Sequence, residues 1–276
     1  PLTFFATTQA IIAAGKNPLF MDVDENGNID LYGPMPTRYD IVLPVHLYGR
    51  PTYVSASYPV TVIEDAAQAH GLPLRGKAAC HSFYPTKNLG AVGQAGAVVT
   101  NDAEFAKRIR TMRTYGERER FVHYALTGNH RMDEIQAAIL RTKLPHLRDW
   151  NRRRTEIAEL YQVALAPNIG SGEKSITLPS VHPDHVWHAF VIRTSGRDDL
   201  QKFLAERGIQ TQVRYPMPMH LQPALAHLGY KKGQFPNAEA WANENLNLPI
   251  YPEMTEGQVE YVASAIKEWA DVGIVR

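Results

Sequence analysis

Two short stretches of the sequence carry residue types that could act together in catalysis. In VIEDAAQAHG, apolar residues lead into the acidic pair Glu64 and Asp65. In HSFYPTKNLG, Ser82 precedes a proline-containing turn that holds Lys87. Each stretch follows an apolar run, so both are predicted at the carboxyl ends of strands, where open α/β sheets bind their ligands.

Lys87 is the candidate nucleophile of this set. A lysine in a constrained turn against apolar walls is partly desolvated, which lowers its pKa and leaves a neutral amine that can attack an aldehyde. Pyridoxal phosphate chemistry requires such an amine, together with a carboxylate that keeps the pyridine nitrogen protonated. Asp65 is the candidate carboxylate, and the hydroxyl of Ser82 could bind the cofactor phosphate. Taken alone, Asp65 is explained equally well as a helix cap before AAQA.

The elements that must position these residues follow an α/β pattern. Short apolar runs rich in Val and Ile alternate with helix-patterned segments. About a dozen residues separate the second run from the third, near the minimum for a parallel crossover, so the helix between them is expected to be a single turn or missing. Helices are predicted over 101–116 and from 133 onward, and Pro145 is expected to kink or break the second one. The runs that predict strands are 18–23, 40–47, 60–65 and 96–100.

A domain boundary is predicted in the segment APNIGSGEKSITLPS, which is rich in Gly, Ser and Pro. Residues 1–165 are therefore predicted to form a large cofactor-binding domain, and residues 166–276 a small C-terminal α/β domain. The elements expected in the small domain are strands over 188–194 and 208–215 and helices at 198–207, near 237–246 and at 255–270.

Composition excludes several classes of protein. The chain has 276 residues, 44% of them hydrophobic, and a formal charge of +1 from 29 Lys and Arg against 28 Asp and Glu, so no bulk field favours nucleic acid or anionic membranes. The single cysteine, Cys80, rules out an internal disulfide and fits a reducing compartment. No apolar run is long enough to span a bilayer and no signal-peptide pattern is present. We therefore expect a cytoplasmic protein with neither membrane nor nucleic-acid partners.

Two motifs imitate metal sites. The stretch DVDENGNID, 22–30, has the offsets of a calcium loop, but Gly33 stands where a bidentate glutamate is required, so a solvated turn is expected. His182, His185 and His188 are spaced by three, but Pro183 lies among them and the segment leads into a predicted strand. These histidines are therefore expected to be structural, and no metal site is predicted.

As a whole, the sequence resembles the DegT/DnrJ/EryC1/StrS family of sugar aminotransferases. The matching blocks follow in order along nearly the whole chain: TFFATTQAI, MDVD, PVHLYG, EDAAQAHG, SFYPTKNLGAVG, GAVVTND, GNHRMDEIQAAILRTKLPHLRDWNRRR, YPMPMHLQPALAHLGY and LPIYP. The resemblance implies a pyridoxal-phosphate-dependent protein of the aspartate-aminotransferase type, fold type I, with a large α/β domain shortened at its N-terminus and a smaller C-terminal α/β domain. Relatives carry a longer segment before the point that aligns with Pro1, including a helix start whose amides bind the phosphate.

The resemblance also implies roles for individual residues. Lys87 matches the lysine that forms an imine with the cofactor aldehyde and, once displaced, shuttles a proton between substrate and cofactor carbons. Asp65 matches the partner of the pyridine nitrogen, and Gln68 lies on the side of the ring hydroxyl. Ser82 matches a phosphate ligand, and Phe4 matches the aromatic residue that stacks on the ring.

A second group of residues is expected at a shared site. Asn129 resembles the residue that a partner subunit donates to the cofactor phosphate, and Arg131 would lie at the same interface and meet the substrate. Tyr215 and His220 are further candidates for substrate contact. A homodimer with a shared active site is therefore expected.

The implied reaction is the transfer of an amino group from an amino acid, glutamate in most relatives, to a nucleotide-linked keto sugar. Lys87 argues against the dehydratases of the family, in which histidine replaces the lysine. The blocks RTYGERERFVHY and RTKLPHLRDWNRRR look most like members that aminate C3 of a thymidine diphosphate 3-keto-6-deoxyhexose. Enzymes that aminate C4, or C3 of a uronic acid, remain alternatives, and so does a non-catalytic dimeric scaffold or sensor of the same fold.

Overall fold

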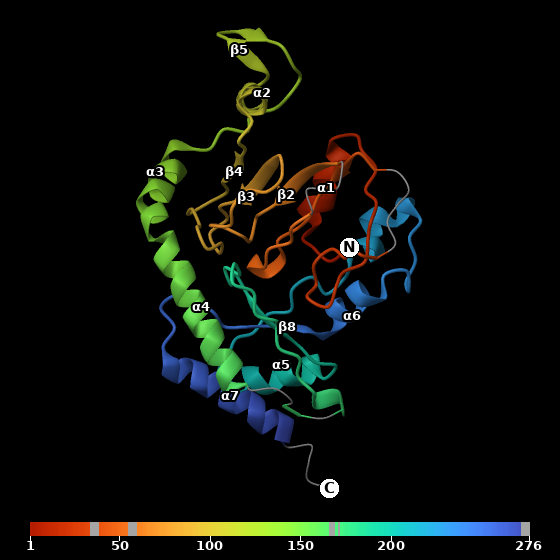
Figure 1. The fold of residues 1–276 in the computed structure, drawn as a ribbon, viewed down its shortest axis with the longest axis vertical. Coiled ribbons are helices and arrows are strands. Elements are labelled where there is room, and N and C mark those ends of the chain that lie inside the picture. Colours follow the sequence, from red (N-terminus) through yellow and green to blue (C-terminus); the bar gives the residue numbers. More distant parts are fainter. Residues whose placement is uncertain (34–38, 55–59, 166–168, 171, 272–276) are drawn as a thin grey trace.

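A four-stranded sheet forms the centre of the N-terminal half in a computed structural model of the chain, which describes residues 1–33, 39–54, 60–165, 169–170 and 172–271 (Figure 1). The strands are β1 (Ile41–Val42), β2 (Thr61–Asp65), β3 (Ala78–Ser82) and β4 (Gly96–Val99), in that order across the sheet. Strands β1, β2 and β3 run parallel, and β4 pairs antiparallel with β3. The carboxyl ends of β2 and β3 therefore lie at the same edge.

The predicted strands over 60–65 and 96–100 and the strand before Ser82 are confirmed. Run 40–47 forms only β1 and one isolated bridge, between Val45 and Asp65. Run 18–23 was predicted wrongly, because it forms a single bridge between Val23 and Ile29 around a turn. In that turn Oδ1 of Asp24 accepts hydrogen bonds from backbone amides two and four residues later, which closes a loop rather than a ladder.

No α-helix among the described residues connects β1 to β2 or β2 to β3. The described part of the connection between β1 and β2 contains one short helical turn, η1 (Leu47–Gly49), as the short spacing predicts.

Four helices accompany the sheet: α1 (Phe5–Ala13), α2 (Ala103–Arg113), α3 (Glu134–Lys143) and α4 (Leu147–Ala164). Asp102 caps α2, because its Oδ1 accepts the amide of Phe105 at 2.9 Å. A hairpin of β5 (Glu117–Glu119) and β6 (Val122–His123) projects with α2 beyond the sheet (Figure 1). Pro145 interrupts the α-helix with the short turn η2 (Leu144–His146), as expected.

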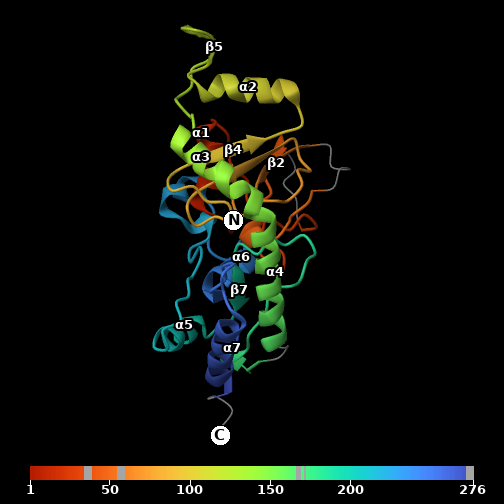
Figure 2. The same ribbon diagram turned by 90° about the vertical axis from the view of Figure 1, so that its left-hand side faces the viewer.

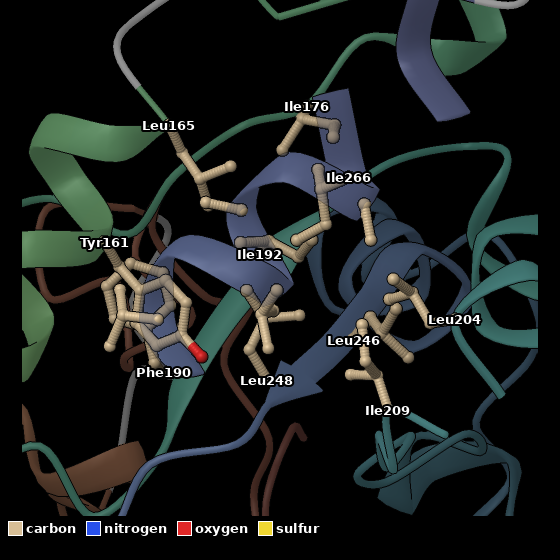
Figure 3. Close-up of a cluster of buried hydrophobic side chains, with 14 of the residues drawn as sticks. Tyr161, Leu165, Ile176, Phe190, Ile192, Leu204, Ile209, Leu246, Leu248 and Ile266 are labelled. Atoms are coloured by element: carbon tan, nitrogen blue, oxygen red, sulfur yellow. The ribbon is translucent and has the colours of Figure 1, made fainter. Parts of the chain in front are cut away.

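The C-terminal part has its own core. Strands β7 (Phe190–Arg193) and β8 (Asn245–Leu248) pair antiparallel, and α5 (Arg197–Ala205), α6 (Pro236–Glu244) and α7 (Glu256–Asp271) accompany them. The turns η3 (Gly172–Lys174), η4 (Met219–Leu221) and η5 (Pro223–Leu228) connect these elements. Figure 3 shows side chains of this core: Tyr161, Leu165, Ile176, Phe190, Ile192, Leu204, Ile209, Leu246, Leu248 and Ile266. Full burial of one Leu, Ile or Phe side chain stabilises the fold by about 1.5–3 kcal/mol.

The two parts of the chain are packed together by shared elements. Helix α4 runs from the side of the sheet to α7, and Ile157 and Tyr161 of its second half belong to the C-terminal core (Figures 1 and 2). A second cluster joins Leu2 and Leu47 to Phe235 and Trp241. The predicted boundary after residue 165 adjoins residues 166–168, which lie outside the described residues.

Of the helices that the structure describes, none has the length and apolar composition that crossing a bilayer requires.

Candidate active site

Asp65 is the last residue of β2, and its carboxylate is fixed by two hydrogen bonds. Its backbone amide donates to the carbonyl of Pro44 at 2.9 Å, which ties the end of β2 to the segment after β1. Oδ1 accepts the amide of Ala67 at 3.1 Å, and Oδ2 accepts the hydroxyl of Thr7 at 2.7 Å. No helix follows Asp65, so the alternative of a helix cap is wrong. The carboxylate is instead oriented by a turn and by α1.

Glu64, one residue earlier, is a structural acid. It is buried, and its side chain accepts the amide of Arg75 at 2.8 Å, the amide of Gly76 and Nε2 of His46 at 3.1 Å. Nδ1 of His46 accepts the amide of Thr52 at 2.9 Å, so the ring proton lies on Nε2. Burial alone would raise the pKa of Glu64, but these hydrogen bonds lower it overall. The pair therefore anchors the loop after β1 and is not available for chemistry.

Lys87 lies in a turn whose amide donates to the carbonyl of Tyr84 at 2.9 Å. Burial and the positive charge of Arg214 together lower the pKa of Lys87 to about 8, although Asp65 acts in the opposite direction. Within the described part of the chain, the amine makes no hydrogen bond or ion pair. The structure thus combines a partly neutral amine with an oriented carboxylate, which is what an aldehyde cofactor with a basic ring nitrogen requires.

Gln68 connects this site to the C-terminal half. Its Oε1 accepts the amide of Tyr48 and its Nε2 donates to the hydroxyl of Tyr215, both at 2.6 Å. The ring of Tyr215 lies 6.4 Å from the ring of Phe4, measured between centroids. Phe4 precedes α1 and is 62% exposed. The structure therefore brings Phe4, Gln68 and Tyr215 together with Asp65.

Behind Lys87, a buried polar network holds the turn. Nδ2 of Asn88 donates to Oδ1 of Asn151 at 2.9 Å and to the carbonyl of Val186 at 2.8 Å. Nδ1 of His188 lies 3.1 Å from Oδ1 of Asn88. Because both hydrogens of the amide are used, we assign His188 as the donor to that oxygen. Burial holds the pKa of His188 well below its usual value, so the ring is neutral and structural, as expected.

Ser82 closes β3, and its Oγ accepts the amide of Tyr84 at 3.3 Å. The register pairs Asp65 with Cys80, so Ser82 stands two residues further along the neighbouring strand. Its hydroxyl is therefore at the same edge of the sheet as Asp65.

Asn129 and Arg131 lie elsewhere. Both are exposed, and Nε of Arg131 donates to Oδ1 of Asn129 at 3.0 Å. In the structure as described, no hydrogen bond or ion pair joins either residue to Lys87, Asp65 or Ser82 of the same chain. They remain candidates for a site on a partner subunit.

The burial of His220 does not favour the predicted role in substrate contact. Its side chain is fully buried, and Nε2 lies 3.0 Å from Oε1 of Glu239. The ring packs edge-on against Phe235 at 4.8 Å. His220 thus belongs to the packing of the C-terminal half.

Two residues at this site were missed by the sequence analysis, Thr7 and Arg214. Thr7 reaches Asp65 across 58 residues, and no local pattern marks such a contact. Arg214 lies close enough to Lys87 to lower its pKa. The available signal for Arg214 was a cation at the end of the strand-like stretch GIQTQVRY, directly before Tyr215.

Known proteins are similar to this chain in sequence and in fold. The model of the DegT/DnrJ/EryC1/StrS aminotransferase family matches residues 1–267. A pleiotropic regulatory protein from Geobacillus stearothermophilus is 43% identical over 97% of this chain and 76% of its own. The dTDP-3-amino-3,4,6-trideoxy-alpha-D-glucose transaminase of Streptomyces venezuelae is 41% identical over 98% of this chain and 75% of its own. The crystal structure of S. venezuelae DesV in complex with a ketimine intermediate matches with a TM-score of 0.91 at 40% identity, covering 98% of this chain and 76% of that one.

The fold, the site and these matches define the class: a pyridoxal-phosphate-dependent aminotransferase of fold type I. The chain belongs to the DegT/DnrJ/EryC1/StrS aminotransferase family. The predicted family, fold class and cofactor are thereby confirmed.

Proposed function

We propose that the protein transfers the amino group of an amino acid, with glutamate as the first donor to test, to the keto group of a nucleotide-linked sugar. The observation that carries this proposal is the amine of Lys87, with a pKa lowered to about 8 and no partner in the described chain, near the fixed carboxylate of Asp65. In this proposal the enzyme is cytoplasmic, which the single cysteine favours.

Each residue of the site has a defined task. Lys87 would hold the cofactor through its aldehyde, and its amine would serve as the group that carries a proton. Asp65 would keep the pyridine nitrogen protonated, and Ser82 would bind the phosphate. When bound, pyridoxal phosphate supplies the electron sink that stabilises a carbanion at the substrate carbon. Phe4 would stack on the ring, and Gln68 would face the side of the ring hydroxyl.

For the acceptor we propose C3 of a thymidine diphosphate 3-keto-6-deoxyhexose. The similarity to the S. venezuelae transaminase, whose name specifies a dTDP-3-amino sugar, supports this choice. C4 ketones and the C3 ketone of a uronic acid are the alternatives, and product analysis distinguishes all three.

We further propose that two copies of the chain share their active sites, with Asn129 and Arg131 reaching the phosphate and the substrate of the partner. Both residues are exposed, and among the described residues no hydrogen bond or ion pair joins them to the site of their own chain. Large apolar side chains are exposed on the projecting segment around them, which is typical of an interface: Phe121, Tyr124, Leu126 and Ile135.

The first experiment is a titration of the purified protein with pyridoxal phosphate. A band at roughly 410–430 nm is expected because the lysine nitrogen conjugates with the aldehyde. Glutamate should then bleach the band, and the keto sugar nucleotide should restore it. The variant Lys87→Ala should give no such band. An unchanged spectrum of the wild type would contradict the proposal and favour a non-catalytic dimeric regulator, a role that the name of the G. stearothermophilus relative suggests.

The shared site has a separate test by complementation. Lys87→Ala and Asn129→Ala variants should each be inactive alone. When mixed dimers form, one of the two sites contains both intact residues, so about a quarter of wild-type activity should return if exchange is random. Sedimentation should show a dimer, and a monomer with full activity would exclude the shared site.

A further inference from the structure

The backbone is strained at Trp187, in the segment that leads into β7. Its φ of 45° is an outlier for a bulky residue. The buried ring stacks on His185 with 3.8 Å between centroids, and the amide of Trp187 donates to Nδ1 of that histidine at 3.0 Å. The carbonyl of Trp187 accepts Nη1 of Arg154 at 3.2 Å. Strain of this kind persists only where the surroundings fix it, and it is found most often at functional sites.

The N-terminal half also holds this strained segment. The amide of Val186 donates to the carbonyl of Gly49 at 3.0 Å, and the amide of Ala189 donates to the carbonyl of Tyr48 at 3.2 Å. A Cβ on Gly49 would lie 2.9 Å from the backbone nitrogen of His188, so the two backbones are in direct contact. The conformation is therefore fixed by η1 as well as by the side chains of the segment itself.

The strained segment presents two groups to the side chain of Asn88. The carbonyl of Val186 accepts Nδ2 of Asn88 at 2.8 Å, and Nδ1 of His188 lies 3.1 Å from its Oδ1. Asn151 of α4 accepts the second amide hydrogen at 2.9 Å. Asn88 and His188 are both buried, so these hydrogen bonds are shielded from bulk water. The amide group therefore has one fixed orientation, and it belongs to the residue directly after Lys87.

We propose that His188 is a positioning residue for the amine of Lys87 and that it acts through Asn88. This inference rests on the proposed function, because it names what keeps the amine where the cofactor aldehyde would bind. The backbone of Lys87 is bonded directly to that of Asn88, so a displacement of the Asn88 amide group moves the turn that carries the lysine. In the described part of the chain no hydrogen bond joins His188 to Lys87, so the effect passes through Asn88.

The positioning role depends on the N–H group of His188 rather than on the bulk of its ring. Burial and neighbouring positive charges hold the pKa of His188 well below its usual value, so the neutral ring carries one proton, which we assign to Nδ1. Its Nε2 is buried and has no hydrogen-bond partner in the part of the chain that the structure describes. A leucine would therefore keep most of the packing but not the donor, whereas an asparagine would place an N–H group close to the position of Nδ1.

The test measures the reactivity of Lys87 in the full chain without cofactor. Trace acetylation with acetic anhydride, followed by mass spectrometry from about pH 6 to about pH 11, gives the midpoint of its titration, with exposed Lys107 as the internal reference for the reagent. The wild-type midpoint should be about 8. In His188→Leu, Oδ1 of Asn88 loses its donor, so the turn should relax, the amine should gain water and the midpoint should rise by about one pH unit. In His188→Asn it should stay close to the wild-type value.

Trp269→Phe is the control for a loss of stability without a change at the turn. Trp269 is buried in the C-terminal core, and its Nε1 donates to Oδ2 of Asp199 at 2.8 Å. Urea unfolding should show that Trp269→Phe and His188→Leu are both less stable than the wild type, but the Lys87 midpoint should move only in His188→Leu. In the cofactor-loaded protein, kcat of His188→Leu should fall about ten- to hundredfold while KM for each substrate stays nearly constant, because the change misplaces the amine and leaves the substrate contacts intact.

An unchanged Lys87 midpoint in His188→Leu would overturn the inference, because the histidine would then only fill space. An equal shift in Trp269→Phe would also overturn it, because any loss of stability would then explain the effect. The labelling requires neither cofactor nor turnover, so it decides the inference even if glutamate fails to bleach the cofactor band. That failure would count against the proposed function alone.

Discussion

The hydroxyl of Thr7 donates a 2.7 Å hydrogen bond to Oδ2 of Asp65, so the first helix of the chain orients the carboxylate at the end of β2. Thr7 is itself held at 2.9 Å from the hydroxyl of Thr3. The acid expected to bind the pyridine nitrogen is thus supported from a segment that lies outside the sheet.

Replacing Thr7 by valine removes this hydrogen bond with little change of shape. A hydrogen bond to a charged group is worth about 1.5–3 kcal/mol, so cofactor affinity should fall roughly ten- to hundredfold in Thr7→Val. Thr7→Ser retains the hydroxyl and should stay close to the wild type. Absorbance titration with pyridoxal phosphate measures both. Equal affinities of Thr7→Val and wild type would show that Asp65 needs no support from α1.

Tyr215→Phe tests the connection between Gln68 and the C-terminal half. Without the hydroxyl, the buried amide of Gln68 keeps the Tyr48 contact through Oε1 but loses the acceptor for Nε2. An unsatisfied buried donor costs about 1–3 kcal/mol, so the free energy of unfolding should fall by that amount in urea titrations, and cofactor affinity should fall with it. Tyr32→Phe, at a fully exposed side chain, should change neither quantity.

The pKa of Lys87 predicts a pH dependence for cofactor loading. The neutral amine is the reactive form, so the loading rate should rise with pH and level off above a midpoint of about 8 rather than near 10.5. Because the charge of Arg214 helps to lower this pKa, Arg214→Gln should move the midpoint to higher pH. Stopped-flow absorbance gives the midpoints. A common midpoint for both proteins would exclude electrostatic coupling between these residues.

Three buried histidines predict instability in acid. Burial lowers the pKa of His70 and of His185 to about 3, and holds that of His188 well below 6.5. Below pH 6.5 these histidines bind protons in the unfolded chain but stay neutral in the folded chain. The stability present at neutral pH is therefore lost as the pH falls from 6.5 towards their pKa values in the folded chain. Each histidine contributes about 1.4 kcal/mol per pH unit in this window. Urea unfolding over that range should show the loss, and His185→Gln should make it less steep.

Glu64 and Asp65 are adjacent, but their replacement by the corresponding amides should affect different properties, stability for Glu64 and turnover for Asp65. In Glu64→Gln, the amide group meets donors on His46, Arg75 and Gly76, so the free energy of unfolding should fall by about 1.5–3 kcal/mol. Activity per folded molecule should persist. In Asp65→Asn, stability should change less and turnover should be lost. Glu159→Gln, exposed on α4, is the control for the loss of a charge. Loss of turnover in Glu64→Gln without loss of stability would contradict the assignment of the catalytic carboxylate to Asp65.

The positions of Asp65 and Lys87 could be predicted from the sequence because they depend on local patterns. Apolar runs place Asp65 and Ser82 at strand ends, and parallel pairing of β2 with β3 brings those ends together. The proline-containing turn then returns Lys87 towards them. The ordered family blocks strengthened this prediction and supplied Phe4 and Gln68.

The remaining residues depend on contacts between distant segments, which local patterns do not encode. Thr7 lies on a helix whose apolar composition gives no sign of its contact with Asp65. The run 18–23 has the apolar character of a strand, but Phe20 packs against Tyr230 and Phe235 instead of entering a ladder. His220 resembled a substrate contact by its position in a family block, whereas its burial against Glu239 emerges only in the folded chain.

Helix α4 connects the turn that holds Lys87 to the hydrophobic core of the C-terminal half. Near its start, Asn151 donates to the carbonyl of His70 and accepts from Asn88, the neighbour of Lys87. Two turns later the same helix inserts Ile157 and Tyr161 among the apolar side chains of the C-terminal half. Because α4 contacts both the neighbour of Lys87 and the C-terminal core, we expect repacking around Tyr161 to alter the position of the lysine without replacing any residue of the site. Laboratory evolution for new acceptors should therefore also sample substitutions in the C-terminal hydrophobic core, which lies away from the site itself.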